Sequence, residues 1–228
     1  MTDDRLSRML LEADPDRFLA AVHSPARLRP ALTALFALDI TMGGIVAATK
    51  EVGLGQIRLA WWREALQHLD RAPPPGEPVL QALHDHVLPL GVSGSALAGM
   101  EEGWVALLLA PSLDDRAALG EHAAMRGGRL FTLAAQILGG GTDAARAGEG
   151  WALADLSHRL SDDAGKAAAR AMAAERLSGW RIPAGAGAAR GLFALAAMAR
   201  DDVSSADRPR RFGPRRQLHF LRYRLIGR

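Results

Sequence analysis

Apolar residues recur along this chain with the spacing of an α-helix, not with the alternation of a β-strand. In one early segment they stand mostly three to five positions apart, at Leu32, Leu35, Phe36, Ile40, Ile45 and Val46. Alanine and leucine dominate the apolar segments, while the aromatic residues common in strands make up only 5% of the chain. The pattern therefore predicts an all-α protein.

Helix start and stop signals divide the chain into about nine predicted helices. Asp14-Pro15 is a capping residue followed by proline at the first helical position, and Ser24-Pro25 repeats the arrangement. The proline-rich segment 72–78 must end the helix before it. Later helices are predicted at 79–88, 95–109, 116–138, 144–160, 165–177, 188–200 and 215–226. With 228 residues and no fixed-period repeat, the sequence predicts a single-domain helical bundle over 1–228.

Composition narrows the possible chemistry and location. The chain has no cysteine, which excludes disulfides, zinc–thiolate sites and thiol catalysis. The first residues are acidic and lack the apolar core of a secretory signal. No run approaches the roughly 20 apolar residues that span a bilayer, residues 104–110 being the nearest. We expect a cytoplasmic protein.

Charge is concentrated at one end of the chain. The net charge is only +3, but residues 208–228 carry eight arginines and no acid, interleaved with apolar residues. Such a segment suits an anionic membrane surface or an acidic partner, and the candidate contacts are Arg210, Arg211, Arg215 and Arg216. The alternative is a helix docked on the bundle with its arginines in water. Nucleic acid is disfavoured, because the arginines are confined to one end and no recognition motif accompanies them.

Four segments, in order, resemble the squalene/phytoene synthase family of isoprenoid condensing enzymes. They read DPDRFLAA from Asp14, RPALTALFAL from Arg29, IRLAWWREAL from Ile57 and GGRLFTLAAQILG from Gly127. The resemblance implies one α-helical bundle around a deep apolar cavity, lined by the helices at 32–46 and 130–138. Expected cavity or ligand contacts are Phe36, Ile40, Arg58, Trp62 and Phe131.

The first metal motif of that family is missing here. In active members the run after the "AL-aromatic-A" helix reads like DDIVD, and its acids hold magnesium against a prenyl diphosphate. The matching positions here are Gly43, Gly44, Ile45, Val46 and Ala47. Ionising an allylic diphosphate needs magnesium to stabilise the leaving group, and acids four apart lie on one helical face. Glu12 and Asp16 are the only acids in the chain three or four apart.

The second metal motif is incomplete. The family pattern resembles QLTNILRD followed by another acid, and residues 155–162 read DLSHRLSD. The degenerate second motif would comprise Asp155, Asp162 and Lys166, with the lysine where the last acid is expected. An ammonium group donates hydrogen bonds but does not ligate a cation.

The resemblance and these departures together predict a non-catalytic protein that needs no cofactor. It looks like the degenerate branch that includes the mitochondrial complex I assembly factor of squalene/phytoene synthase type. We expect an accessory or assembly factor that binds an isoprenoid or lipid in the inherited cavity and has a membrane-associated protein partner. One alternative is an active prenyltransferase that holds magnesium unconventionally. A second is a peripheral binder of anionic membrane through the Arg-rich tail.

Overall fold

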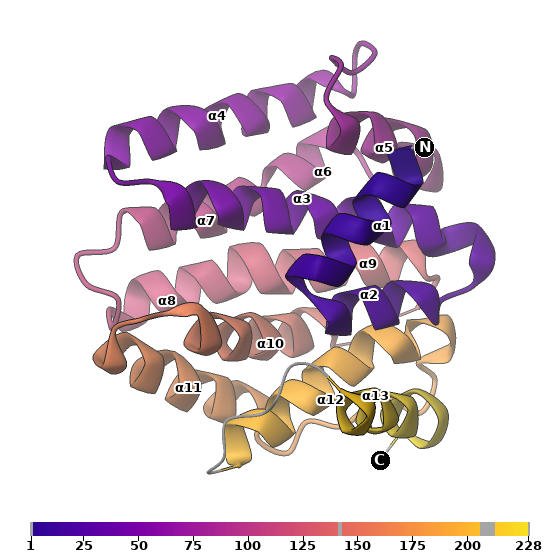
Figure 1. The fold of residues 1–228 in the computed structure, drawn as a ribbon, viewed down its shortest axis with the longest axis vertical. Coiled ribbons are helices and arrows are strands. Elements are labelled where there is room, and N and C mark those ends of the chain that lie inside the picture. Colours follow the sequence, from indigo (N-terminus) through magenta and orange to yellow (C-terminus); the bar gives the residue numbers. More distant parts are fainter. Residues whose placement is uncertain (1, 141–142, 206–212, 228) are drawn as a thin grey trace.

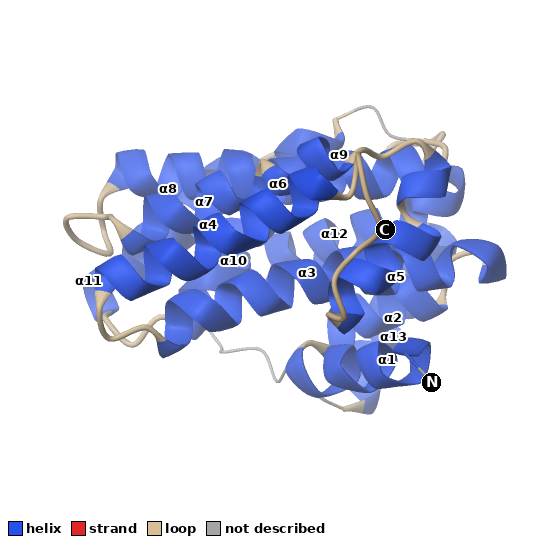
Figure 2. Cartoon of the chain, turned by 90° about the horizontal axis from the view of Figure 1, so that it is seen from above, coloured by secondary structure: helices blue, strands red, loops and turns tan. Residues whose placement is uncertain are grey.

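The computed structural model describes residues 2–140, 143–205 and 213–227. These residues form helices and connecting loops with no strand, so the all-α prediction is confirmed (Figure 2). In chain order the helices are α1 (Thr2–Ala13), α2 (Pro15–Val22), α3 (Arg29–Ala48), α4 (Val52–His68), α5 (Pro78–His86), α6 (Gly94–Ala98), α7 (Met100–Leu108), α8 (Arg116–His122), α9 (Arg129–Ile137), α10 (Ala144–Arg159), α11 (Asp163–Leu177), α12 (Arg190–Ser204) and α13 (Pro214–Ile226).

The helix boundaries differ from the predicted ones in three places. Helix α1 was not predicted, the segment 95–109 divides at Gly99 into α6 and α7, and a π-helical turn at Ala123–Gly128 interrupts 116–138. The predicted cap at Asp14 is present, since its carboxylate accepts the Arg17 backbone N–H at 3.1 Å. The predicted cap at Ser24 is wrong, because its hydroxyl donates to the Ala20 carbonyl at the end of α2.

Helix α3 runs through the middle of the bundle, in contact with α1, α2, α4, α5, α7 and α9 (Figure 1). Every residue from Ala31 to Asp39 is buried. Among the described residues, Ala26–Ala48 alone is long and apolar enough to cross a membrane, so the expectation that no such segment exists was wrong. Burial of 61% of its apolar window inside the bundle accounts for this composition, because a core helix meets the same criterion.

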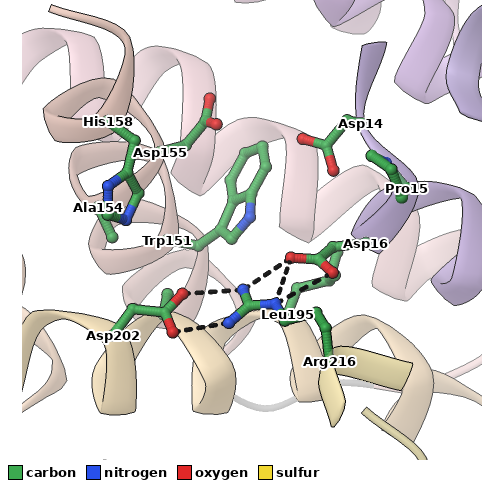
Figure 3. A pocket seen from close by; sticks show the side chains of 11 residues that line it. Asp14, Pro15, Asp16, Trp151, Ala154, Asp155, His158, Leu195, Asp202 and Arg216 are labelled. Atoms are coloured by element: carbon green, nitrogen blue, oxygen red, sulfur yellow. Dashed lines mark hydrogen bonds and ion pairs between the residues drawn. The ribbon is translucent and has the colours of Figure 1, made fainter. Parts of the chain in front are cut away.

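The C-terminal helix α13 is tied to the bundle by a clasp formed by Arg216, Asp16 and Asp202 (Figure 3). The guanidinium of Arg216 donates to Asp202 of α12 at 2.6 Å and to Asp16 of α2 at 2.7 Å. Burial raises the pKa of Asp16, and the neighbouring Arg216 opposes the rise. Phe220 and Tyr223 of α13 are also buried in the core. The tail is thus partly an internal element of the fold.

This arrangement corrects one of the predicted membrane contacts. Arg216 is largely buried in ion pairs and is not available to a membrane, whereas Arg215 is exposed. Arg210 and Arg211 lie outside the described residues. The alternative that the segment docks on the bundle is therefore correct for the buried side of α13, while its other side faces solvent.

We expect Arg216→Ala to lower the free energy of unfolding by about 2–4 kcal/mol, because it leaves two largely buried carboxylates without their cation. The neighbouring exposed Arg215→Ala should change it by less than about 0.5 kcal/mol. Urea denaturation at neutral pH measures both. Equal stability of the two variants would contradict the clasp.

Candidate functional site

The largest described cavity, about 730 Å³, lies between α3, α7 and α10. Its lining includes Thr49, Leu113 and Leu160, from the α3–α4, α7–α8 and α10–α11 connections, which lie at the same end of the bundle (Figure 1). The walls are mainly apolar: Ile40, Gly43, Gly44, Val46, Ala47, Thr49, Val52, Trp104, Leu107, Leu108, Leu113, Leu156 and Leu160. Four charged residues complete the lining: Arg17, Asp39, Arg126 and Arg159. The cavity therefore has apolar walls and one charged region.

The charged region is centred on Asp39, a fully buried residue of α3. The guanidinium of Arg126 donates two parallel hydrogen bonds to its carboxylate, both 2.9 Å long. Arg17 donates to the same carboxylate at 2.6 Å, and the indole N–H of Trp104 donates at 3.2 Å. Asp39 thus accepts four hydrogen bonds, three of them from cations.

Arg126 also joins Asp39 to a second buried acid, because it donates to Asp155 of α10 at 2.8 Å. Its guanidinium lies over the rings of Trp104 and Trp151, with centroids 4.4 Å and 5.1 Å away. A planar cation that forks between two carboxylates and stacks on two indoles is fixed in position on every side. Arg126 therefore ties α3 to α10 through an ionic bridge.

Two further ion pairs complete the cluster. Arg17 donates to Asp14 at 3.0 Å, and Arg159 donates to Asp155 at 3.0 Å and approaches Asp14 at 3.5 Å. The buried-charge cluster then consists of three arginines, Arg17, Arg126 and Arg159, and three aspartates, Asp14, Asp39 and Asp155. Its formal charges cancel. Of the six side chains, Arg159 alone is substantially exposed, at 39%.

The electrostatics of the cluster favour this ionised arrangement. Burial would raise the pKa of Asp39, but the charge and hydrogen bonds of Arg126 outweigh it and hold the pKa below its usual value. Burial also opposes the charge of Arg126, yet the two carboxylates hold its pKa above the usual range. Beside it, burial and the Arg126 charge lower the pKa of His122 to about 4. His122 is therefore neutral at pH 7, with Nδ1 donating to the Gly103 carbonyl at 2.7 Å.

Close backbone packing is what delivers Arg126 to this position. The π-helical turn that carries it packs directly on α10. A Cβ atom at Gly127 would lie 2.2 Å from the Gly148 carbonyl oxygen, and one at Gly148 would lie 2.0 Å from the Gly127 carbonyl oxygen. No residue with a side chain fits at either point. π-Helical turns recur at functional sites, and here one sets the direction of the bridging arginine.

The first degenerate motif borders the cavity as the alignment implied, and its two glycines have different surroundings. Gly43, Gly44 and Ala47 all contribute to the lining. A Cβ atom at Gly43 would lie 2.8 Å from the Trp104 ring, whereas one at Gly44 would meet nothing within 4 Å. Gly43 is thus required by the packing of Trp104, while Gly44 leaves the cavity wide.

The second motif is placed differently from the prediction. Asp155 belongs to the buried-charge cluster, but Asp162 caps α11 by accepting the Gly165 N–H at 2.6 Å. Lys166 pairs with Asp163 at 2.7 Å, and neither Asp162 nor Lys166 lines the cavity. Because α10 ends at Arg159, the chain turns away before residue 162. The α10 cation that reaches the cavity is Arg159.

The other predicted contacts are divided between the cavity, the core and a second hollow. Ile40 lines the cavity, as expected. Phe36 and Phe131 are fully buried core residues that do not line it, and α9 contributes nothing to its walls, so those two contacts and the predicted 130–138 wall were wrong. Arg58 and Trp62 line a separate surface groove on α4.

The residues of the buried-charge cluster were missed by the sequence analysis, except for Asp155. One signal was available, because Asp39 is a lone acid within the apolar segment ALFALDITM. A charged residue at a core position is almost never fully buried without a partner. Its partners come from α2, α7 and the π-helical turn, and no sequence spacing joins them.

An all-α bundle with an apolar cavity between these helices has the isoprenoid synthase fold, and comparison with solved structures agrees. The crystal structure of a dehydrosqualene synthase in complex with ligand superimposes with a TM-score of 0.73, covering 98% of this chain and 95% of that one at 12% sequence identity. The squalene/phytoene synthase family model matches residues 10–224. This chain therefore belongs to the squalene/phytoene synthase family. Comparison with curated proteins gave no match.

The two glycines provide a paired test of the cavity wall. Both substitutions to alanine gain helix propensity worth about 1 kcal/mol, but only Gly43→Ala drives a methyl group into a tryptophan that Asp39 and Arg126 hold in place. We expect Gly43→Ala to be less stable than Gly44→Ala by about 1–3 kcal/mol in chemical denaturation. Equal stabilities would show that Trp104 is free to move.

Proposed function

We propose that this protein is a non-catalytic member of the squalene/phytoene synthase family that binds an isoprenoid or other lipid tail in its cavity. Its role would be that of an accessory or assembly factor. The observation that carries the proposal is the buried-charge cluster: the carboxylates beside the cavity are bound by arginines of the same chain. An arginine bridge joins α3 to α10, and its α3 acid, Asp39, lies one helical turn before Gly43, where the family resemblance places the first metal-binding acids.

The residues present do not fit magnesium. Mg²⁺ requires oxygen ligands in near-octahedral geometry, usually including one or two carboxylates. Asp39 already accepts four hydrogen bonds, and Asp155 is shared by Arg126 and Arg159. Recruiting either acid to a metal would leave a buried guanidinium without its partner, at a cost of several kcal/mol. In the described part of the chain, no group of three or more His, Asp or Glu side chains is arranged to hold a metal ion.

The cavity itself favours a long apolar ligand. Its volume of about 730 Å³ lies within the usual range for small-molecule sites. The walls offer aliphatic and indole surface. The partly exposed guanidinium of Arg159 can donate hydrogen bonds to acceptor groups of a polar head, but it cannot accept any. The solved dehydrosqualene synthase was crystallised with a ligand. An amphipathic ligand would place its chain along the walls and its acceptor head near Arg159.

An accessory role follows from what the site retains and what it lacks. A cavity that binds an isoprenoid without activating its diphosphate acts by holding the ligand or by responding to it. The resemblance to the complex I assembly factor of this type supports a membrane-associated respiratory partner. That part of the proposal rests on the sequence resemblance alone.

The alternative of an active prenyltransferase has one supporting observation. Arg17, Arg126 and Arg159 all line the cavity, and fixed cations can stabilise a developing diphosphate charge. Their formal charge, however, is cancelled by Asp14, Asp39 and Asp155. A neutral cluster offers a leaving diphosphate much less stabilisation than free metal ions would.

We expect no pyrophosphate release from farnesyl or geranylgeranyl diphosphate with magnesium or manganese, and no metal-dependent shift in melting temperature. Both follow because the acids are occupied. A coupled pyrophosphate assay with a boiled control measures the first result, and thermal denaturation with and without metal measures the second. Release above the control that disappears in Arg159→Ala would replace this proposal with the prenyltransferase.

We expect the protein to bind a farnesyl chain carrying a fluorophore, and Gly44→Trp to weaken that binding about tenfold or more, because the indole would occupy an open part of the cavity. The matched control is Ala48→Trp, an exposed position on the same helix that does not line the cavity. Fluorescence anisotropy measures the affinities. Absence of saturable binding by the unmodified protein, or equal affinity of the two variants, would refute the lipid site.

A further inference from the structure

Helix α4 is apolar on two faces, and only one of them is covered. Its inner face buries Gly55, Leu59, Trp62 and Leu66 against the bundle. Its outer face exposes Leu54 by 56%, Ile57 by 67% and Trp61 by 47%, three and four residues apart. The helix forms one edge of the bundle in Figure 1 and lies in front of the other helices in Figure 2. We name Leu54, Ile57 and Trp61 the α4 stripe.

The α4 stripe borders a groove that shares a lining residue with the cavity. Ile57 and Trp61 line a surface groove of about 590 Å³ together with Gly44 and Ile45 of α3. Gly44 also lines the cavity, so groove and cavity meet at this residue. The cavity lining also includes Val52, the first residue of α4, which is itself 47% exposed. The groove on α4 and the cavity inside the bundle therefore lie next to each other at Gly44.

We propose that the α4 stripe docks on a phospholipid bilayer and that the groove admits a lipid from that bilayer to the cavity. The second part rests on the proposed lipid-binding function. A ligand with a long apolar chain is found in membranes far more than in water, so a cavity for it is useful where its mouth meets the membrane. The observation that favours this occupant is that Ile57 and Trp61 of the stripe line a groove that shares Gly44 with the cavity.

Charge and area agree with a bilayer. Lys50 and Arg58 are exposed beside the stripe, and Glu51 and Glu64 are the exposed acids near it. Long cationic side chains can reach lipid phosphates while apolar neighbours insert. Trp61 suits the interface, where an indole has one apolar and one wet side. The stripe covers on the order of a few hundred Å², which is well below the roughly 800 Å² per partner of a stable protein complex. A second copy of this chain is therefore the weaker candidate.

The outer side of α13 is the competing surface. It exposes Leu218, Leu225 and Ile226 by 64–67%, beside Arg215. Helices α4 and α13 lie at opposite ends of the long axis (Figure 1). The pocket that Arg216 of α13 shares with Asp14 and Asp155 of the buried-charge cluster holds only about 30 Å³ (Figure 3). A second hollow beside α13 is lined by Arg181, Arg200 and Tyr223 and not by the cavity residues.

Site-specific labelling tests the location, because the chain contains no cysteine. Ile57→Cys carrying an environment-sensitive nitrobenzoxadiazole label should brighten and shift to shorter wavelength with phosphatidylcholine vesicles, with or without phosphatidylserine. Labels at Leu11→Cys, an exposed position on α1, and at Leu225→Cys on α13 should change little. A label that responds at position 225 but not at 57 would assign the membrane contact to the tail and overturn the proposal.

Matched double variants test the contribution to binding. Leu54→Ser with Ile57→Ser should weaken vesicle co-sedimentation about tenfold or more, since both side chains lose apolar area to insert. Leu225→Ser with Ile226→Ser, equally exposed, should bind as the unmodified protein does. Thermal unfolding checks that both remain folded. Unchanged binding of the α4 variant overturns the proposal, and so does a wild-type dimer that the α4 substitutions dissociate, because the stripe would then belong to a second copy.

Separate variants test the lipid-binding cavity and the membrane-docking stripe, so that either proposal can be refuted without the other. Ala47→Trp, which enlarges a side chain of the cavity lining outside the groove, should lose the fluorescent farnesyl ligand and keep vesicle binding. The Leu54→Ser and Ile57→Ser variant should lose vesicle binding and keep the soluble ligand. If the unmodified protein binds vesicles through the stripe but no ligand, the docking surface stands and the lipid site falls. If it binds the ligand but no vesicle, the docking surface falls alone.

Discussion

The bridge that Arg126 makes between Asp39 and Asp155 is the interaction on which the rest of the site depends. It joins the central helix α3 to α10 across the inner end of the cavity, with two parallel hydrogen bonds to one acid and one to the other. Because all three groups are buried, loss of any one leaves uncompensated charge in the interior. Trp104, which takes its position from Asp39 and Arg126, in turn requires Gly43 on the cavity wall.

This bridge is the observation on which the proposed function rests. In this member of the squalene/phytoene synthase family a cavity lies between the helices. The charged side chains at one end of the cavity have no net formal charge, because its arginines and aspartates form ion pairs with one another. Guanidinium groups supplied by the chain do not dissociate as metal ions do, so the cluster is permanent. In the proposed function the site needs no metal, and its chemistry is limited to holding a ligand. The proposed function rests on this pairing of the buried acids with arginines of the same chain.

Helices α4 and α13 both expose apolar side chains on the surface of the protein. On α13 the two arginines have different surroundings: Arg216 forms ion pairs with α2 and α12, whereas Arg215 faces water. On α4 the exposed apolar side chains border a groove that meets the cavity. The Arg-rich sequence makes the tail a candidate membrane contact. Helix α4 differs from it because the groove beside α4 shares Gly44 with the cavity.

The sequence by itself determined the helical class, most helix positions, the family and the loss of acids at Gly43, Gly44 and Ala47, because each is written in local spacing or in a contiguous motif. It did not reveal the buried-charge cluster. The partners of Asp39 lie 22 and 87 positions away, and only the packing of four separate segments makes them neighbours. Likewise, the exposure of Ile57 and the burial of Arg216 depend on which helices cover which faces. Those pairings are long-range, so tertiary structure alone decided them.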